Sequence, residues 1–121
     1  MLKHLITPIF SLLLTAVAVA ESEFRHLVLF SFKDDAAAED ISKIEKAFAA
    51  LPEKIDSIKD FEWGTNVSPE GKAKGFTHCF LVTFKDQAGL EVYLPHEAHQ
   101  AFVSMLKPSL KDVLVIDYVA K

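Results

Sequence analysis

The sequence contains only one cysteine, Cys79, among its 121 residues. A disulfide within the chain is therefore impossible, and folding must rest on packing alone. Glycine is also scarce, with four residues, and the sequence has neither a phosphate-binding glycine loop nor a Gly-x-Ser-x-Gly turn. A paired-carboxylate motif is missing as well. These absences exclude the common signatures of nucleotide-binding proteins, serine hydrolases and glycosidases.

The chain has fewer basic residues than acidic residues. The chain has 13 lysines and arginines against 17 acidic residues, which gives a formal net charge of −4. Binding to phosphate backbones requires clustered lysine and arginine, and the Lys-Ala-Lys sequence at residues 72–74 is too small a cluster. We therefore expect no nucleic-acid partner.

Only one long apolar run is present, and it lies at the N-terminus. Lys3 precedes the run at residues 5–20, which ends in Ala-Val-Ala just before Glu21. This layout predicts a secretory signal peptide, residues 1–20, cleaved after Ala20, and hence export to the periplasm or the exterior. An uncleaved membrane anchor is the alternative, but Pro8 and the short run disfavour it. No membrane span is expected after cleavage.

The predicted mature chain, residues 21–121, is one small acidic domain. Removal of residues 1–20 takes away only Lys3 among the charged residues, so the formal net charge falls from −4 to −5. A chain of this size buries a modest fraction of its surface on folding. A second copy would be a natural source of additional burial.

Alternating apolar residues predict two similar strands, at residues 24–33 and 76–85. One face of the first strand carries Phe24, His26, Val28, Phe30 and Phe32. The matching face of the second carries Phe76, His78, Phe80, Val82 and Phe84.

Between these strands, a helix is predicted from Asp34 and Asp35, which supply cap chemistry, to Pro52, which ends it. Its apolar positions recur at steps of three and four residues: Ile41, Ile44, Phe48 and Leu51. A weaker strand follows at residues 57–68, then a Gly- and Pro-containing loop at 69–75. The remaining elements are a helical stretch at 87–107, interrupted at Leu94-Pro95, and a strand at 113–119.

The element order strand, helix, strand, strand, helix, strand predicts an α+β fold with a ferredoxin-like βαββαβ subunit. Such a subunit has a four-stranded antiparallel sheet with both helices on one face and with the first and third strands adjacent. We predict an apolar opposite face formed by Leu27, Leu29, Cys79, Leu81, Val113 and Val115. Because such a face would not remain in water, we expect a face-to-face homodimer.

Two histidines, His26 and His78, fall on adjacent predicted strands and point to the same face. They could border a pocket, or each could be a core residue satisfied by one hydrogen bond. Cys79 follows His78 but points to the opposite face, which rules out a Cys-His nucleophilic dyad.

The sequence Tyr-Leu-Pro-His-Glu-Ala-His at residues 93–99 brings further reactive side chains. Pro95 biases Leu94 toward extended geometry and suits the first helical turn, so Tyr93 is expected before the helix. His96 and His99, three residues apart, then lie on nearly one helical face.

Phe102 and Met105 continue that face toward the core. If it packs on the sheet face that bears His26 and His78, four imidazoles and the Tyr93 phenol border one cavity.

Such a cavity could support proton transfer. Burial and the positive end of a helix both disfavour charged imidazole, so His96 and His99 should be neutral and able to accept a proton. Tyr93 can donate a hydrogen bond to a carbonyl or enolate oxygen. A zinc-like site on His-x-x-His is a competing interpretation, but its spacing is not that of the established zinc signatures. We expect no metal and no cofactor.

Three segments together carry a family resemblance: residues 25–33, 63–102 and 113–119. They resemble the stress-responsive A/B barrel (Dabb) domain, and the resemblance covers residues 24–119. It implies a ferredoxin-like subunit that pairs into a dimeric α+β barrel. In one enzyme of this family, a cofactor-free plant polyketide cyclase, a catalytic tyrosine and histidine match Tyr93 and His99.

Pocket histidines of that cyclase match His26, His78 and His96, which the resemblance implies as substrate-binding residues here. Glu97 departs from the family pattern, in which a second proline is frequent at this position. Two functions remain open: a small-molecule-binding enzyme that uses acid/base chemistry, and a non-enzymatic stress-response or ligand-binding homodimer.

Overall fold

The computed structural model describes residues 22–121, and the predicted signal peptide and its cleavage site lie outside this range. The chain forms the following elements in order: β1 (Phe24–Phe32), α1 (Ala38–Ala49), α2 (Leu51–Lys54), β2 (Ile58–Thr65), β3 (His78–Phe84), α3 (Gln87–Tyr93), α4 (Glu97–Leu106), the 3-10 turn η1 (Lys107–Ser109) and β4 (Leu110–Val119).

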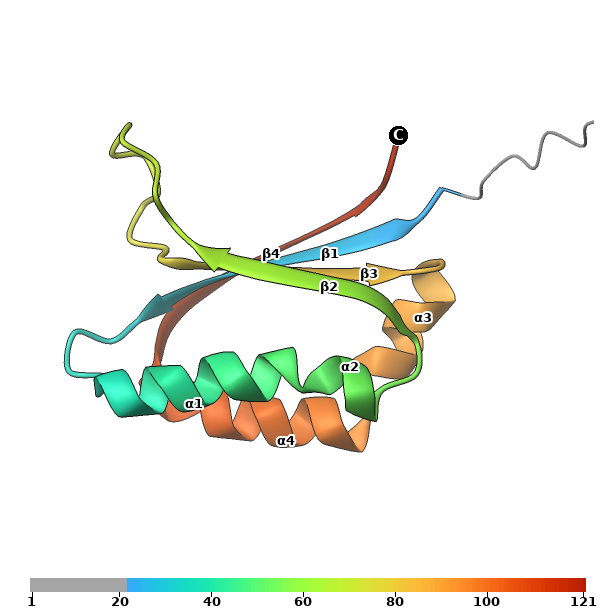
Figure 1. Ribbon diagram of the computed structural model, residues 1–121, viewed down its shortest axis with the longest axis horizontal. Coiled ribbons are helices and arrows are strands. Elements are labelled where there is room, and N and C mark those ends of the chain that lie inside the picture. The colour runs from blue at the N-terminus through green and yellow to red at the C-terminus, as the bar shows by residue number, and fades with distance from the viewer. Residues whose placement is uncertain (1–21) are drawn as a thin grey trace, which may run out of the picture.

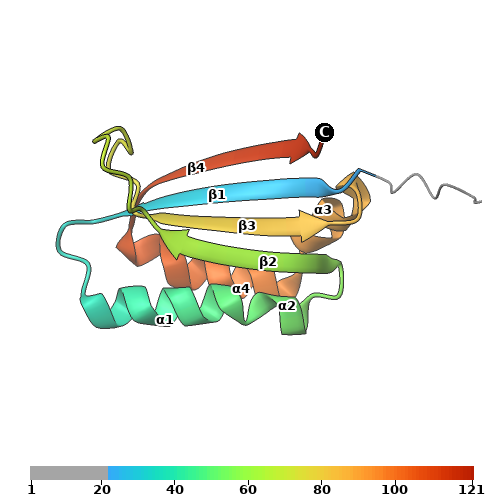
Figure 2. The same cartoon turned by 45° about the horizontal axis from the view of Figure 1, so that its top comes forward.

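The four strands form one antiparallel sheet in the order β2-β3-β1-β4 (Figure 2). The first and third strands are therefore neighbours, as the element order predicted. Helices α1 and α4 lie side by side beneath one face of this sheet, and α3 closes one end (Figure 1). The predicted α+β, ferredoxin-like fold is confirmed.

The first helix begins later than predicted. Asp34 and Asp35 lie in a turn, and Ala37 is the N-cap residue of α1, without a side-chain cap hydrogen bond. Pro52 does not simply end the helical segment, since it lies in the first turn of α2. Proline is tolerated there because the first amide groups of a helix have no partner within it.

Stacked phenylalanines form the centre of the core. The Phe48 ring of α1 lies 4.3 Å from that of Phe80 on β3 and 4.7 Å from that of Phe102 on α4, measured between ring centroids. Phe30 on β1 joins them at 5.2 Å from Phe80. Because each ring comes from a different element, this cluster fixes α4 against the sheet.

The prediction for the faces of the last strand is wrong. In the β1–β4 register, Val115 lies opposite Val28 and Val113 lies opposite Phe30, so both valines face the helices. A run of apolar residues has no alternation from which its facing could be read, and pairing alone decides it. The outer face instead carries Leu27, Leu29, Cys79, Leu81, Leu114, Ile116 and Tyr118.

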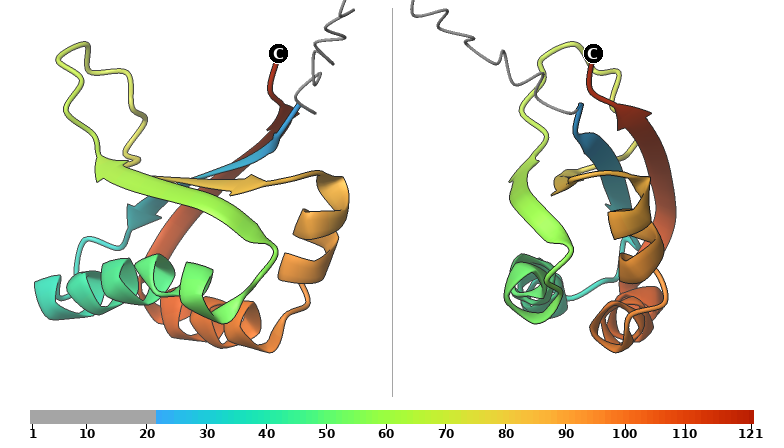
Figure 3. Two further views of the ribbon diagram at one scale, coloured as in Figure 1. Left: turned by 45° about the vertical axis from the view of Figure 1, so that its right-hand side comes forward. Right: turned by 90° about the vertical axis from the view of Figure 1, so that its right-hand side faces the viewer.

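The second predicted strand also begins later, at His78, and Phe76 belongs to the preceding loop. This loop rises from the sheet on the side away from the helices (Figure 3). Phe76 borders a hollow of about 450 Å³ on the outer face, together with Leu29 and Leu81.

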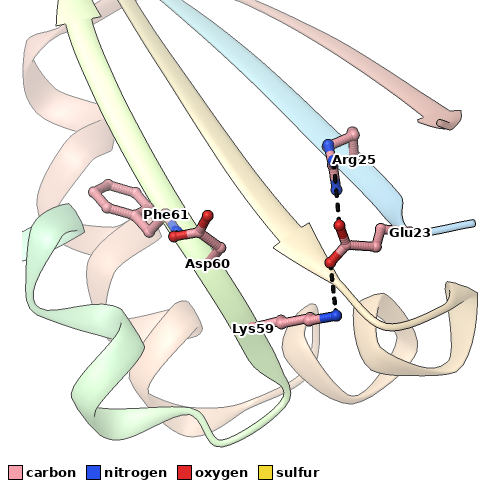
Figure 4. Close-up of polar contacts among 5 residues, drawn as sticks. All are labelled: Glu23, Arg25, Lys59, Asp60 and Phe61. Atoms are coloured by element: carbon pink, nitrogen blue, oxygen red, sulfur yellow. Dashed lines mark hydrogen bonds and ion pairs between the residues drawn. The ribbon is translucent and has the colours of Figure 1, made fainter. Parts of the chain in front are cut away.

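An exposed ion-pair network links the start of β1 to β2 (Figure 4). The Glu23 carboxylate lies 2.8 Å from the Lys59 ammonium and 3.4 Å from the Arg25 guanidinium. The hydrogen bond and charge of Lys59 lower the pKa of Glu23 below its usual value. Within residues 22–121, no helix is long and apolar enough to cross a bilayer.

Candidate functional site

A cavity of about 390 Å³ lies between α4 and the helix-facing side of β1 and β4. One end carries four polar side chains, from His26, Tyr93, His99 and Asp117. Apolar side chains line the rest, including Phe30, Phe102, Leu106 and Val115. A mostly apolar cavity of this size with a few convergent polar groups has the general form of a small-molecule site.

Helix α3 places Tyr93 in this cavity. The Asp86 carboxylate caps the helix by accepting a hydrogen bond from the Gly89 amide, 3.2 Å away. Gly89 lies against the sheet, where an added Cβ would be 3.0 Å from the Phe84 Cβ. Glycine therefore allows α3 to pack closely on the end of β3, and this close packing sets the position of Tyr93 one turn later.

The Tyr93 side chain is 1% exposed. Burial raises its pKa well above the usual value, so the hydroxyl keeps its proton at neutral pH. In the described part of the chain, no residue forms a hydrogen bond with this hydroxyl. The hydroxyl is therefore free to donate a hydrogen bond to a ligand in the cavity.

The turn between α3 and α4 differs from the prediction. Leu94 adopts αR geometry (φ −58°, ψ −47°) instead of extended geometry, and Tyr93 is the last residue of α3. The Leu94 amide still donates to the Leu90 carbonyl, 2.9 Å away, so Leu94 keeps helical geometry despite the preference for extended geometry before proline. Pro95 itself lies in the turn, and α4 begins at Glu97.

This turn fixes the tautomer of His99. The Leu94 carbonyl can only accept, so the His99 Nδ1–H donates to it across 2.9 Å, and the Gln100 side-chain amide donates to the same oxygen. In neutral His99 the proton is therefore on Nδ1. The lone pair on Nε2 remains available to accept a proton.

The environment of His99 favours this neutral form. Burial lowers its pKa below the usual value, and the charges of His26 and His96 act in the same direction, whereas the hydrogen bond that His99 donates to the Leu94 carbonyl acts in the opposite direction. The direction agrees with the expected neutral imidazole. The Tyr93 and His99 rings lie 4.3 Å apart between centroids, so a base and a hydrogen-bond donor are adjacent.

His26 has a partner that sequence reasoning missed. Its Nδ1 donates to the Asp117 carboxylate across 2.5 Å, and its ring lies 5.7 Å from that of Tyr93. The side chains are 7% and 36% exposed, respectively. Asp117 is the single acidic residue in the otherwise apolar strand predicted at residues 113–119, and this exception in the pattern could have identified it as a functional residue. Asp117 orients His26 and leaves its Nε2 for the cavity.

Two predicted site residues, His96 and His78, do not border this cavity. The His96 Nδ1 accepts a hydrogen bond from the Ala98 amide, 3.0 Å away, so His96 is the N-cap of α4. Met105, expected to point toward the core, is 40% exposed. Phe102 faces the core as predicted, and Leu106 is buried beside it in place of Met105.

His78 lies at the other end of the sheet face. It pairs with Phe30, whereas His26 pairs with Val82, four residues further along β3. Its Nε2 donates to the Glu45 carboxylate, 2.9 Å away, and its Nδ1 lies 2.8 Å from the Thr77 hydroxyl. The four imidazoles therefore do not share a cavity, and His78 joins α1 to β3.

No group of three or more potential metal ligands gathers anywhere in residues 22–121. The cavity holds two imidazoles and one carboxylate, and Asp117 is already bound to His26. Together with the Tyr93 hydroxyl, these groups are of the kind that donate and accept hydrogen bonds.

Comparisons with known proteins agree with this fold. The family model of the stress responsive A/B barrel domain matches residues 24–120. The stress-response A/B barrel domain-containing protein HS1 of Arabidopsis thaliana is 39% identical over 99 residues, which cover 82% of this chain and 91% of that protein.

Olivetolic acid cyclase of Cannabis sativa is 29% identical over 97 residues, covering 80% of this chain and 96% of the cyclase. Among solved structures, a dimeric ferredoxin-like protein of unknown function from Jannaschia sp. CCS1 superposes with a TM-score of 0.70. It is 28% identical, and the match covers 79% of this chain and 97% of that one.

Proposed function

This chain belongs to the stress responsive A/B barrel domain family, and we propose that its cavity binds a small organic carbonyl compound. We further propose that it catalyses cofactor-independent proton transfer at the carbon next to that carbonyl. The observation that carries the proposal is the adjacency of Tyr93 and His99, with ring centroids 4.3 Å apart in a mostly apolar cavity.

In the proposed reaction, His99 Nε2 removes a proton from the α carbon. The C–H electron pair forms the carbon–carbon π bond of the enolate, and the carbonyl π electrons move onto oxygen. The Tyr93 hydroxyl donates a hydrogen bond to that oxygen, which stabilises the developing charge. The enolate can then attack a second carbonyl to form a carbon–carbon bond, and the imidazolium returns its proton to the new alkoxide.

Two further features support this chemistry. The Leu94 carbonyl holds the His99 proton on Nδ1, which leaves the correct nitrogen free. The 29% identical olivetolic acid cyclase is named for a cyclisation, which is the reaction class that enolate attack within one molecule would produce. The roles of His26, His78 and His96 in substrate binding stay predictions, and the cavity geometry favours His26 among them.

Deuterium exchange tests the proton transfer without knowledge of the natural substrate. A panel of ketones and β-keto acids is incubated with the protein in D₂O, and incorporation next to the carbonyl is followed by NMR. Tyr93→Phe should lower the exchange rate by about a hundredfold, and His99→Gln by at least as much.

Tyr118→Phe is the matched control, because it removes the hydroxyl of an exposed tyrosine that does not border the cavity, and it keeps the ring on the outer face. It should exchange like the wild type. The enzymatic proposal fails if no ketone exchanges faster with the wild type than with Tyr93→Phe while both proteins remain folded.

A non-enzymatic ligand-binding protein is the second candidate. The predominantly apolar lining of the cavity favours it, since only one end carries groups suited to chemistry. In that case a ketone would shift the His99 resonances on binding, and no exchange would follow. The same NMR experiment therefore separates the two functions.

We also propose that the protein is a homodimer that pairs through the outer sheet face. Leu114, Ile116 and Tyr118 on this face are 40%, 47% and 44% exposed, and the Jannaschia relative is dimeric. A charge at the centre of the face, in Leu29→Lys, should shift the sedimentation coefficient from that of a dimer to that of a monomer. Lys43→Glu, on the exposed side of α1, is the control.

Export is a further proposal, supported by the sequence of residues 1–20 alone. Mass spectrometry of protein recovered from the periplasm or medium should find a chain that begins at Glu21. A full-length chain retained in the cytoplasm would contradict export.

A further inference from the structure

The cavity is elongated, and β1, β4 and α4 each run along its length. Along β1 its wall runs from His26 to Phe30, and along β4 from Asp117 to Leu110. Along α4 and into the first residue of η1, the wall runs from His99 to Lys107. One end is therefore the polar end already described, and the other end is formed where α4 turns into β4.

The length of the cavity follows from regular geometry. Eight residues separate His99 from Lys107, which at about 1.5 Å per helical residue is about 12 Å. The four residues from His26 to Phe30 give about 13 Å at 3.3 Å per strand residue. The helix and the strand thus both indicate a cavity about 12 Å long.

The two charged residues that border the cavity have opposite signs and lie at opposite ends, and Lys107 is exposed to solvent. Asp117 is at the end that holds His26, and Lys107 is at the other. Between them the wall is apolar, with Phe102, Val103 and Val115 among its residues. No carboxylate of residues 22–121 lies within ion-pair distance of the Lys107 ammonium.

This distribution of charge selects the orientation of a ligand. A carboxylate would be repelled by Asp117 and attracted by Lys107. Lys107 follows the C-terminal end of α4, where the helix dipole favours cations, so the backbone does not attract an anion there. The side-chain ammonium must supply all of the attraction, which makes a substitution of this one residue informative.

We propose that Lys107 binds the carboxylate of a linear acid whose carbonyl group, at the far end of an apolar chain, reaches Tyr93 and His99. An extended chain advances about 1.25 Å per carbon, given C–C bonds of about 1.52 Å and near-tetrahedral angles, so the cavity accommodates about eight to ten carbons. The assignment of the carbonyl end rests on the proposed function, whereas carboxylate binding at Lys107 does not.

Calorimetric titrations with decanoate and decanol test the anion site, because the two probes share the chain and differ in charge. The wild type should bind decanoate more tightly than decanol. Lys107→Gln should weaken decanoate binding by about threefold to tenfold and leave decanol binding unchanged. Added salt should reproduce the effect for decanoate only.

Lys111→Gln is the matched control, since Lys111 is exposed at the start of β4 and does not border the cavity. It should bind both probes like the wild type. Equal decanoate affinities for the two lysine variants would overturn the proposal, as would a wild type that binds decanol as tightly as decanoate or binds neither.

The two proposals fail separately. If decanoate binding depends on Lys107 but no ketone exchanges deuterium, the anion site at Lys107 is supported and the proposed enzymatic activity is refuted. If neutral ketones exchange deuterium but Lys107→Gln leaves the decanoate affinity unchanged, the enzymatic activity is supported and the anion site is refuted. If both proposals hold, an oxo acid of matching length should exchange faster than the ketone that lacks its carboxylate.

Discussion

Replacement of Asp117 by alanine is expected to destabilise the protein through His26. The His26 side chain is 7% exposed, and its Nδ1–H would lose its only acceptor. A buried donor left without a partner costs about 1–3 kcal/mol. Because the Asp117 side chain is 36% exposed, water can partly replace it, so we expect about 1–2 kcal/mol, the lower half of that range.

For a domain of about 100 residues, this loss corresponds to a fall in Tm of about 5–15 °C. Asp117→Asn keeps an acceptor oxygen and should lose about half as much. Circular dichroism during thermal unfolding gives Tm, and urea unfolding gives the free energy. Deuterium exchange should also slow, because a freed His26 ring no longer keeps a fixed position beside Tyr93.

Asp112→Ala provides the comparison on the same strand. The Asp112 carboxylate is exposed and accepts a hydrogen bond only from the neighbouring Val113 amide. Its loss should change the free energy of unfolding by less than about 0.5 kcal/mol. If the two alanine variants lose equal stability, the pairing of Asp117 with His26 does not contribute as we infer.

Three further changes test the site and the core. Gly89→Ala would place a methyl group 3.0 Å from a β3 side chain. We expect it to lower the free energy of unfolding, measured in urea, by about 1–3 kcal/mol. Gly64→Ala, where an added methyl group meets no atom within 4 Å, should lower this free energy far less. Phe48→Ala removes the central ring of the core and should cost about 3–5 kcal/mol, with Phe48→Leu less severe in the same assay. Because the pKa of His99 is lowered on folding, its contribution to stability is present above the unfolded pKa, about 6.5, and is lost as the pH falls through the folded pKa. His99→Gln should therefore flatten the dependence of unfolding free energy on pH in that acidic range, and an unchanged slope would contradict the assigned environment.

The fold could be predicted from sequence because its pattern is local. Alternation at residues 24–33 and 76–85 specifies half-buried strands, and the steps of three and four residues up to Leu51 specify a helix. Their order along the chain then leaves few topologies. The ends of the elements could not be read in the same way, since Asp34 and Pro52 are each compatible with more than one position in a helix.

The candidate site was predicted in part. Tyr93 and His99 do lie together, but their adjacency depends on the αR geometry of Leu94, which overrides the local preference before proline. The grouping of His78 with His26 did not hold, because a shared sheet face says nothing about distance along it. That distance is set by the β1–β3 register.

The sequence by itself therefore determined the kinds of secondary-structure element, their order, and which histidine and tyrosine side chains were candidates for a site. The tertiary structure alone decided which of these groups meet. Strand pairing brought Asp117 to His26 from 91 residues away, and the packing of α4 on the sheet turned His99 toward the same cavity. Both depend on contacts between distant segments, for which local propensity and periodicity carry no information.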